Sequence, residues 1–276
     1  EMTSSLVGSE MCIRDSYNSI FELYAAWGVD FIKCDDICRE LPHEEAELVM
    51  LSNALKGCGR DMVLSLSPGP ALLEKAELYK QVSNMWRITD DFWDQWELLY
   101  AMFERAEKWC THSGPGHWPD ADMLPIGPIN QVWSKENRTK FTKEEQITML
   151  TLWSIFRSPL MLGGELTGFD AFTLALVTNE AVLAMHQMAR HAHQVWRRVI
   201  GGSEYILWTA VCAEGGQYAA VFNVGDHNGT IEIQLRDLEI EHASTAMELW
   251  SGEESTIDSS LTVSLNAHGA KAYQIR

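Results

Sequence analysis

The sequence predicts an α/β protein in which part of a (β/α)8 TIM barrel, about strands 4 to 8, precedes a C-terminal antiparallel β-sandwich domain. Two patterns predict this fold. From about residue 17, short apolar runs alternate with longer amphipathic segments, as in β-α units around a parallel sheet. Beyond about residue 198, short alternating strands are separated by turn residues, which is typical of an all-β module. We therefore expect a partial barrel over 17–197 and the sandwich over 198–276.

The first sixteen residues do not fit this pattern. Residues 5–16, which read SLVGSEMCIRDS, resemble the translated remnant of a sequencing adapter, so we expect 1–16 to be non-native. About five β-α units follow, whereas eight units close a barrel. We therefore expect an N-terminally truncated chain whose open strand edges make it poorly soluble or inactive when expressed alone.

The β-α units are delimited by apolar runs and by the breakers between them. The strands are predicted at 29–34, 62–66, 85–88 and 159–162. A helix from about residue 43 carries Leu48, Leu51 and Leu55 on one face, and a second helix runs through Tyr79.

Two further helices are predicted in the second half of the barrel. The first repeats aromatic and apolar residues at i, i+3, i+4 and i+7, and we expect these side chains in the core: Trp96, Leu99, Tyr100 and Phe103. The second begins at a capping box made by Thr142 and Glu145. Between these helices, residues 111–133 hold seven Gly and Pro residues and are predicted to be a long, functional loop. In the β module, Asp226-His227-Asn228-Gly229 predicts a hairpin turn.

Composition excludes several classes of partner. The net charge of −18 and the pI near 4.8 would repel nucleic acid and anionic membranes, so neither is expected as a partner. No apolar run reaches the roughly 18 residues of a membrane span. Eleven Trp residues offer flat faces for stacking on sugars, although Trp more often fills core volume. Six cysteines without a Cys-x-x-Cys motif indicate no metal site and no dense disulfide framework.

Two acidic clusters follow predicted strands, where barrel active sites are built. Lys33 and Asp35 are two residues apart, so both project to one side of the strand and the cation favours an ionised carboxylate. An ordinary loop acid beside a surface Lys is an equal alternative. In the second cluster, Arg87 precedes Asp90, Asp91 and Asp94. Helix N-termini also favour Asp, and we assign at least one of these three acids to that role.

A third cluster lies in the long loop. His117, Trp118, Asp120 and Asp122 combine an aromatic ring with two acids, which is a frequent arrangement for binding sugar hydroxyls. Two acids are too few for a calcium ion without other partners, and a lone His is more often structural than catalytic.

Four segments together resemble, in order, the motifs of glycoside hydrolase family 27, the melibiase-type α-galactosidases and α-N-acetylgalactosaminidases. They read WGVDFIKCD at 27–35, WRITDD at 86–91, GHWPDADML at 116–124 and LWSIFRSPL at 152–160. The resemblance runs from about residue 17 to the C-terminus. It implies the predicted fold, a retaining double displacement, and no metal or organic cofactor.

The resemblance also implies residue roles. Asp35 matches the nucleophile and Asp91 the general acid/base, and such a pair lies roughly 5 to 5.5 Å apart in retaining enzymes. Lys33, Arg87 and Asp122 match sugar-binding positions. Ser67 is the fourth residue that the resemblance implies for substrate binding. It stands where many α-galactosidases have a Glu that contacts the sugar 2-hydroxyl, and it is closer to the N-acetylgalactosaminidase pattern.

The implied substrate is a galactose-containing oligosaccharide or glycoconjugate, cleaved at its terminal α-D-galactosyl residue. The implied alternatives are α-N-acetylgalactosaminide and β-L-arabinopyranoside hydrolysis, and a noncatalytic carbohydrate-binding protein remains the alternative from another class. Family members are often exported. Cys38 stands one place later than the family's half-cystine, so we expect no disulfide there.

Overall fold

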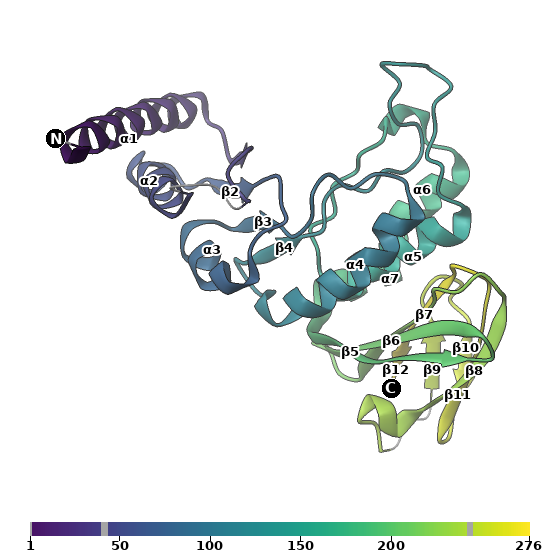
Figure 1. Ribbon diagram of the computed structural model, residues 1–276. Coiled ribbons are helices and arrows are strands. Elements are labelled where there is room, and N and C mark those ends of the chain that lie inside the picture. Colours follow the sequence, from purple (N-terminus) through teal and green to yellow (C-terminus); the bar gives the residue numbers. More distant parts are fainter. Residues whose placement is uncertain (1, 40–43, 242–244) are drawn as a thin grey trace. The chain divides into compact units, whose positions relative to one another are not determined.

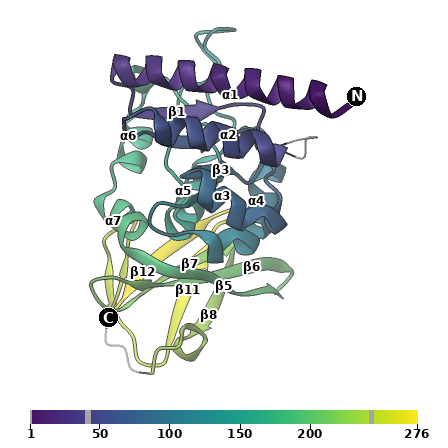
Figure 2. The same cartoon turned by 90° about the vertical axis from the view of Figure 1, so that its left-hand side faces the viewer.

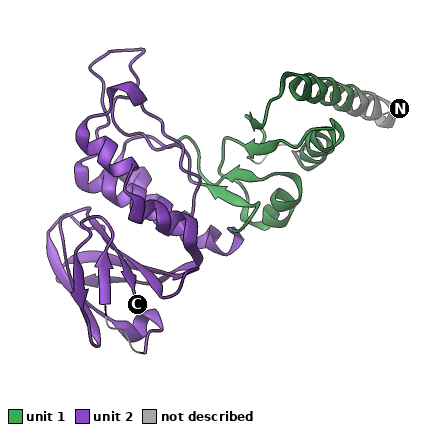
Figure 3. Cartoon of the chain, turned by 180° about the vertical axis from the view of Figure 1, so that it is seen from behind, with its two compact units in different colours: residues 1–91, 114–120 green, residues 92–113, 121–276 purple. Residues whose placement is uncertain are grey.

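The computed structural model describes residues 2–39, 44–241 and 245–276, with side chains from residue 12 onward. The chain divides into two compact units (Figure 3), one made of 1–91 with 114–120 and the other of 92–113 with 121–276. The first unit holds a parallel sheet with helices, and the second holds further helices and antiparallel sheets. This combination fits part of a TIM barrel followed by a β-sandwich, as the sequence predicts.

The first unit is built on four parallel strands in the order β1-β2-β3-β4 (Figure 1). Their bounds are β1 (Phe31–Cys34), β2 (Val63–Leu66), β3 (Met85–Arg87) and β4 (Trp118–Asp120). The predicted strands at 29–34, 62–66 and 85–88 are therefore confirmed with shorter bounds.

Three helices accompany this sheet: α1 (Met2–Trp27), α2 (Glu44–Gly57) and α3 (Ala76–Val82). Figure 2 shows α1 alongside α2, where the Tyr17 hydroxyl donates a hydrogen bond to Glu47 Oε1 at 2.6 Å. Leu48 and Leu51 are buried and Leu55 is half-buried, which confirms the predicted apolar face of α2. The start predicted for this helix, His43, lies outside the described residues.

Two features of the sheet differ from the prediction. β4 lies inside the segment predicted as a loop, because three residues that include Pro119 show no alternation to detect. It pairs with β3 through hydrogen bonds from Trp118 N to Asn84 O and from Ile88 N to Asp120 O. The strand predicted at 159–162 is wrong, because only Leu162 forms a single parallel bridge. Pro159 offers no backbone donor, and two glycines follow the bridge.

The second unit begins with four helices: α4 (Trp96–Trp109), α5 (Lys143–Phe156), α6 (Ala171–Val177) and α7 (Glu180–Met188). The predicted capping box is confirmed, since Thr142 Oγ1 accepts from Glu145 N at 3.2 Å and Glu145 Oε2 accepts from Thr142 N at 2.7 Å.

The aromatic stripe of α4 is only partly in the core. Leu99 and Phe103 are fully buried as predicted. Trp96 is half-buried and stacks on His268 at 3.6 Å. The prediction is wrong for Tyr100, which is 38% exposed because its hydroxyl donates to Glu204 Oε2. A phenol can meet an apolar face and a polar partner together, so spacing alone does not decide its burial.

The rest of the second unit is an antiparallel sandwich. A six-stranded sheet has the order β10-β9-β12-β7-β6-β5, and a two-stranded sheet pairs β11 with β8. The bounds are β5 (Ala189–Ile200), β6 (Ser203–Cys212), β7 (Gln217–Asn223), β8 (Gly229–Gln234), β9 (Thr245–Glu248), β10 (Glu254–Thr256), β11 (Ser260–Leu265) and β12 (Ala270–Ile275).

The sandwich core lies between these two sheets. Leu207 and Val221 of the larger sheet pack with Ile233 and Val263 of the smaller one. The predicted hairpin at 226–229 is wrong, because these residues lead from β7 to β8, which lie in different sheets. Turn residues specify a local bend, whereas the partner strand is chosen by long-range packing.

Candidate active site

The predicted site residues of the first unit gather at the carboxyl ends of its parallel strands. Asp35 directly follows β1, Ser67 follows β2, and Arg87 ends β3 with Asp91 four residues later. Parallel strands end at one edge of a sheet, and in barrels that edge carries the chemistry. We call this set of four residues the carboxyl edge.

The first strand presents alternate residues to solvent. Phe31 and Lys33 are exposed, Ile32 and Cys34 are half-buried, and Asp35 continues the exposed series. Lys33 and Asp35 therefore share one face, as their spacing predicts. No salt bridge joins the two within the described part of the chain, so a different partner holds this carboxylate. On the opposite face, burial raises the pKa of the Cys34 thiol, which disfavours a reactive thiolate there.

Ser67 is the partner of Asp35. Its Oγ donates to Asp35 Oδ1 at 2.8 Å, and the Ser67 side chain is only 1% exposed. The backbone around it is tied to the same loop, because Ser67 N donates to Cys34 O at 2.9 Å and Ile37 N donates to Ser67 O at 3.1 Å. A buried hydroxyl thus holds one oxygen of an exposed carboxylate.

Arg87 and Asp91 form the second pair. Arg87 is 2% exposed, and its Nη2 lies 3.0 Å from Oδ1 of Asp91, whose side chain is 68% exposed. Asp90 Oδ1 accepts a hydrogen bond from Asp91 N at 2.8 Å, which fixes the backbone at this point. The guanidinium orients one carboxylate oxygen, and the other can exchange a proton with solvent or ligand. The distance between Asp35 and Asp91 stays a prediction.

Asp122 belongs to the second unit, whereas the four residues of the carboxyl edge belong to the first. Its Oδ2 accepts from Phe92 N at 2.8 Å, and its carbonyl accepts from Trp153 Nε1 at 3.0 Å. Its φ of 79° is left-handed, which is uncommon for a residue other than Gly and marks a constrained turn. Asp94 has a structural role, since its Oδ2 accepts from Lys140 N at 2.6 Å.

The sequence gives Asp120 no role of its own beyond membership of the loop cluster. In the structure it ends β4 in register with Arg87, and it is only 2% exposed. The two residues lie on adjacent strands with side chains on the same face. This pairing depends on β4, and a strand of three residues is too short to show an alternation in the sequence that would predict it.

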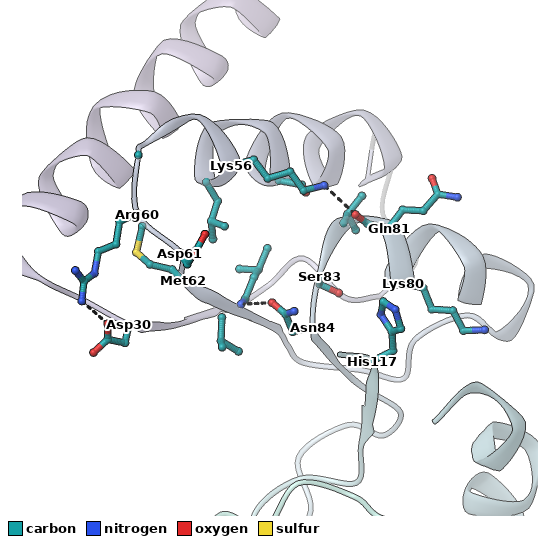
Figure 4. A pocket seen from close by; sticks show the side chains of 16 residues that line it. Asp30, Lys56, Arg60, Asp61, Met62, Lys80, Gln81, Ser83, Asn84 and His117 are labelled. Atoms are coloured by element: carbon teal, nitrogen blue, oxygen red, sulfur yellow. Dashed lines mark hydrogen bonds and ion pairs between the residues drawn. The ribbon is translucent and has the colours of Figure 1, made fainter. Parts of the chain in front are cut away.

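A cavity of about 790 Å³ lies in the same unit but at the opposite edge of the sheet. Its walls include residues that precede the strands, namely Asp30, Met62, Asn84 and His117 (Figure 4). Two polar side chains here hold backbone groups, since Asn84 Oδ1 accepts from Leu64 N at 3.0 Å and Lys56 Nζ donates to Gln81 O at 3.0 Å. The exposed Asp30 pairs with Arg60, which also donates to a backbone carbonyl, that of Val29, at 2.9 Å. We call this wall the amino edge. This cavity holds neither carboxylate of the carboxyl edge.

In residues 2–39, 44–241 and 245–276, no group of three or more His, Cys, Asp or Glu side chains is placed to hold a metal ion. Within the same ranges, no helix combines the length and apolarity that a bilayer crossing requires.

The chain matches two family models that follow one another along the sequence. The model described as "Alpha galactosidase A" matches residues 8–188. The model described as "Alpha galactosidase C-terminal beta sandwich domain" matches residues 202–275. The first match covers the parallel sheet and the helices up to α7, and the second covers the sandwich strands β6 to β12.

Several known proteins resemble the chain over most of its length. Alpha-galactosidase D of Emericella nidulans is 26% identical over 269 residues, covering 91% of this chain and 39% of that protein. The crystal structure of a GH27-β-L-arabinopyranosidase from Geobacillus stearothermophilus has 46% identity and a TM-score of 0.90, covering 95% of this chain and 61% of that one.

A candidate alpha-N-acetylgalactosaminidase from Bacillus halodurans also has a similar structure. It is 40% identical with a TM-score of 0.80, covering 95% of this chain and 61% of that one. The chain thus spans between about two fifths and three fifths of the length of these three relatives.

Proposed function

The chain belongs to glycoside hydrolase family 27, the melibiase-type α-galactosidases, and from this membership we propose that it is a retaining exo-glycosidase that hydrolyses terminal α-D-galactosyl residues. The observation that carries the proposal is the carboxyl edge, where two carboxylates each receive a hydrogen bond from a buried side chain. A retaining glycosidase needs two such carboxyl groups with different roles.

In the proposed mechanism, the free oxygen of Asp35 attacks the anomeric carbon while Asp91 protonates the departing glycosidic oxygen. The C–O bond to the leaving group breaks as the ester bond to Asp35 forms. Asp91, now a carboxylate, then removes a proton from water, which attacks the same carbon and releases the sugar and Asp35. Two inversions give net retention. The high exposure of Asp91 suits a group that must reach both the leaving group and water.

Three further residues are proposed to bind the sugar: Lys33, Arg87 and Asp122. Lys33 is an exposed cation on the same face of its strand as Asp35, so it can donate to a hydroxyl of a sugar bound there. Galactose-containing oligosaccharides and glycoconjugates are the proposed substrates.

A second candidate activity is β-L-arabinopyranoside hydrolysis. It is favoured by the 46% identity to the Geobacillus enzyme, compared with 26% to the Emericella α-galactosidase. β-L-Arabinopyranose has the ring configuration of α-D-galactopyranose without the C6 hydroxymethyl group, so one pocket can accept both sugars.

The test compares kcat/KM for the nitrophenyl glycosides of α-D-galactose, β-L-arabinopyranose and α-N-acetylgalactosamine, measured on the full-length protein. We expect α-galactoside turnover that is abolished by Asp35→Ala and by Asp91→Ala. Tenfold or greater preference for the arabinoside would select the second candidate. Sugar binding without turnover of any of the three would contradict the enzymatic proposal.

A further inference from the structure

We propose that Ser67 is a positioning residue for Asp35. The Ser67 hydroxyl holds Asp35 Oδ1, so that the other carboxylate oxygen, Oδ2, faces the anomeric carbon. This inference rests on the proposed function, in which Asp35 is the nucleophile. It starts from the 2.8 Å hydrogen bond between Ser67 Oγ and Asp35 Oδ1.

The hydroxyl is held in place by its backbone. Ser67 N donates to Cys34 O and Ile37 N donates to Ser67 O, so Ser67 is hydrogen-bonded to the chain on both sides of Asp35. Two residues further on, Gly69 N donates to Thr89 O at 3.0 Å. A Cβ at Gly69 would collide with the carbonyl oxygens of Arg87 and Thr89, so this segment packs directly on the chain after β3. The donor therefore does not depend on a mobile loop.

The hydrogen bond bears on both chemical steps. A serine hydroxyl can donate one hydrogen bond, and here Asp35 Oδ1 accepts it. Donation to the charged form favours the ionised nucleophile. When the ester forms, Oδ1 becomes its carbonyl oxygen and the hydrogen bond weakens. When water releases the sugar, Asp35 becomes a carboxylate again and its hydrogen bond from Ser67 strengthens, which favours this second step.

The test measures pH profiles of kcat/KM for the full-length protein and for Ser67→Ala. Loss of a hydrogen bond to a charged group is expected to lower kcat/KM by about tenfold to a hundredfold. Because the charged carboxylate loses a hydrogen-bond donor, the acid limb of the profile should move to higher pH. Ser67→Thr retains the hydroxyl and should restore the acid limb.

Ser65→Ala provides a matched control. Ser65 lies two residues earlier on the same face of the strand and is also fully buried, but its Oγ has no hydrogen-bond partner in the described part of the chain. This variant should keep the wild-type acid limb, and thermal unfolding verifies that both alanine variants fold.

The outcomes separate this inference from the proposed function. If the wild type turns over galactoside and Asp35→Ala does not, an unmoved acid limb in folded Ser67→Ala overturns the positioning role alone. If Asp35→Ala remains active, the nucleophile assignment fails and the inference fails with it.

Discussion

The two edges of the parallel sheet use polar side chains in different ways. At the carboxyl edge, buried Ser67 and Arg87 bind the side chains of exposed Asp35 and Asp91. At the amino edge, Asn84 binds a backbone group, and the exposed carboxylate of Asp30 pairs with Arg60, which is itself exposed and also binds backbone carbonyls. The difference is therefore in the donors: buried side chains orient the carboxylates of the carboxyl edge, whereas the donors of the amino edge hold the backbone. The cavity at the amino edge therefore does not identify the reactive edge.

The sharpest test of this contrast is Asp35→Ala. Removal of a nucleophile eliminates the covalent step, so kcat should fall by about a thousandfold or more. Because the variant leaves the buried Ser67 hydroxyl without its acceptor, the free energy of unfolding should also fall, by about 1–3 kcal/mol, while the protein stays folded. Steady-state assays with nitrophenyl α-galactoside check the first expectation. Turnover within tenfold of wild type would contradict the proposal that Asp35 is the nucleophile and that the carboxyl edge is the active site.

Arg87→Lys should have the next largest effect. Lys keeps the charge but not the guanidinium geometry that places Nη2 3.0 Å from Asp91 Oδ1, so kcat/KM should fall by about tenfold to a hundredfold. The side chain is almost fully buried, and the variant should also unfold at a lower temperature. Equal activity of the two proteins would mean that the guanidinium does not orient the acid/base.

At the amino edge, Asn84→Ala should affect stability and not catalysis. The variant leaves the backbone N–H of buried Leu64 without its acceptor, which should lower the free energy of unfolding by about 1–3 kcal/mol. Denaturant unfolding measures this loss. Asn84→Asp, which keeps an acceptor oxygen, is the control. A large fall in kcat of the folded variant would mean that the amino edge takes part in the reaction.

The smallest effect is expected for Lys56→Ala. Its Nζ donates to Gln81 O in an exposed bond, so both kcat/KM and the free energy of unfolding should stay near wild type, within about 0.5 kcal/mol for the latter. Chemical denaturation measures the free energy of unfolding, and the galactoside assay measures kcat/KM. A marked rise in KM would show that the cavity wall contacts substrate.

Much of this arrangement was predictable because its signals are local. The apolar runs before Lys33 and Arg87 end at polar residues, which placed both acidic clusters after strands. The capping box of Thr142 and Glu145 likewise depends on residues three apart. Motifs of this kind act within one turn or one strand, so a single sequence contains them fully.

The remaining features depend on partners that are distant in sequence. β4 forms only because β3 lies beside it, and Ser67 meets Asp35 across 32 residues of chain. The Asp226–Gly229 turn leads to a strand in the other sheet, because packing of the sandwich chooses that partner. Sequence spacing specifies which residues share a face, but not which hydrogen bonds their side chains make.

The most direct measurement of the central claim is mass spectrometry of the full-length protein after reaction with an activated, fluorinated galactoside that slows release of the glycosyl-enzyme. The account predicts one added glycosyl group per chain, located by peptide mapping on Asp35 and absent from Asp35→Ala. A glycosyl group on another residue, or turnover that gives the inverted anomer with no adduct, would contradict it.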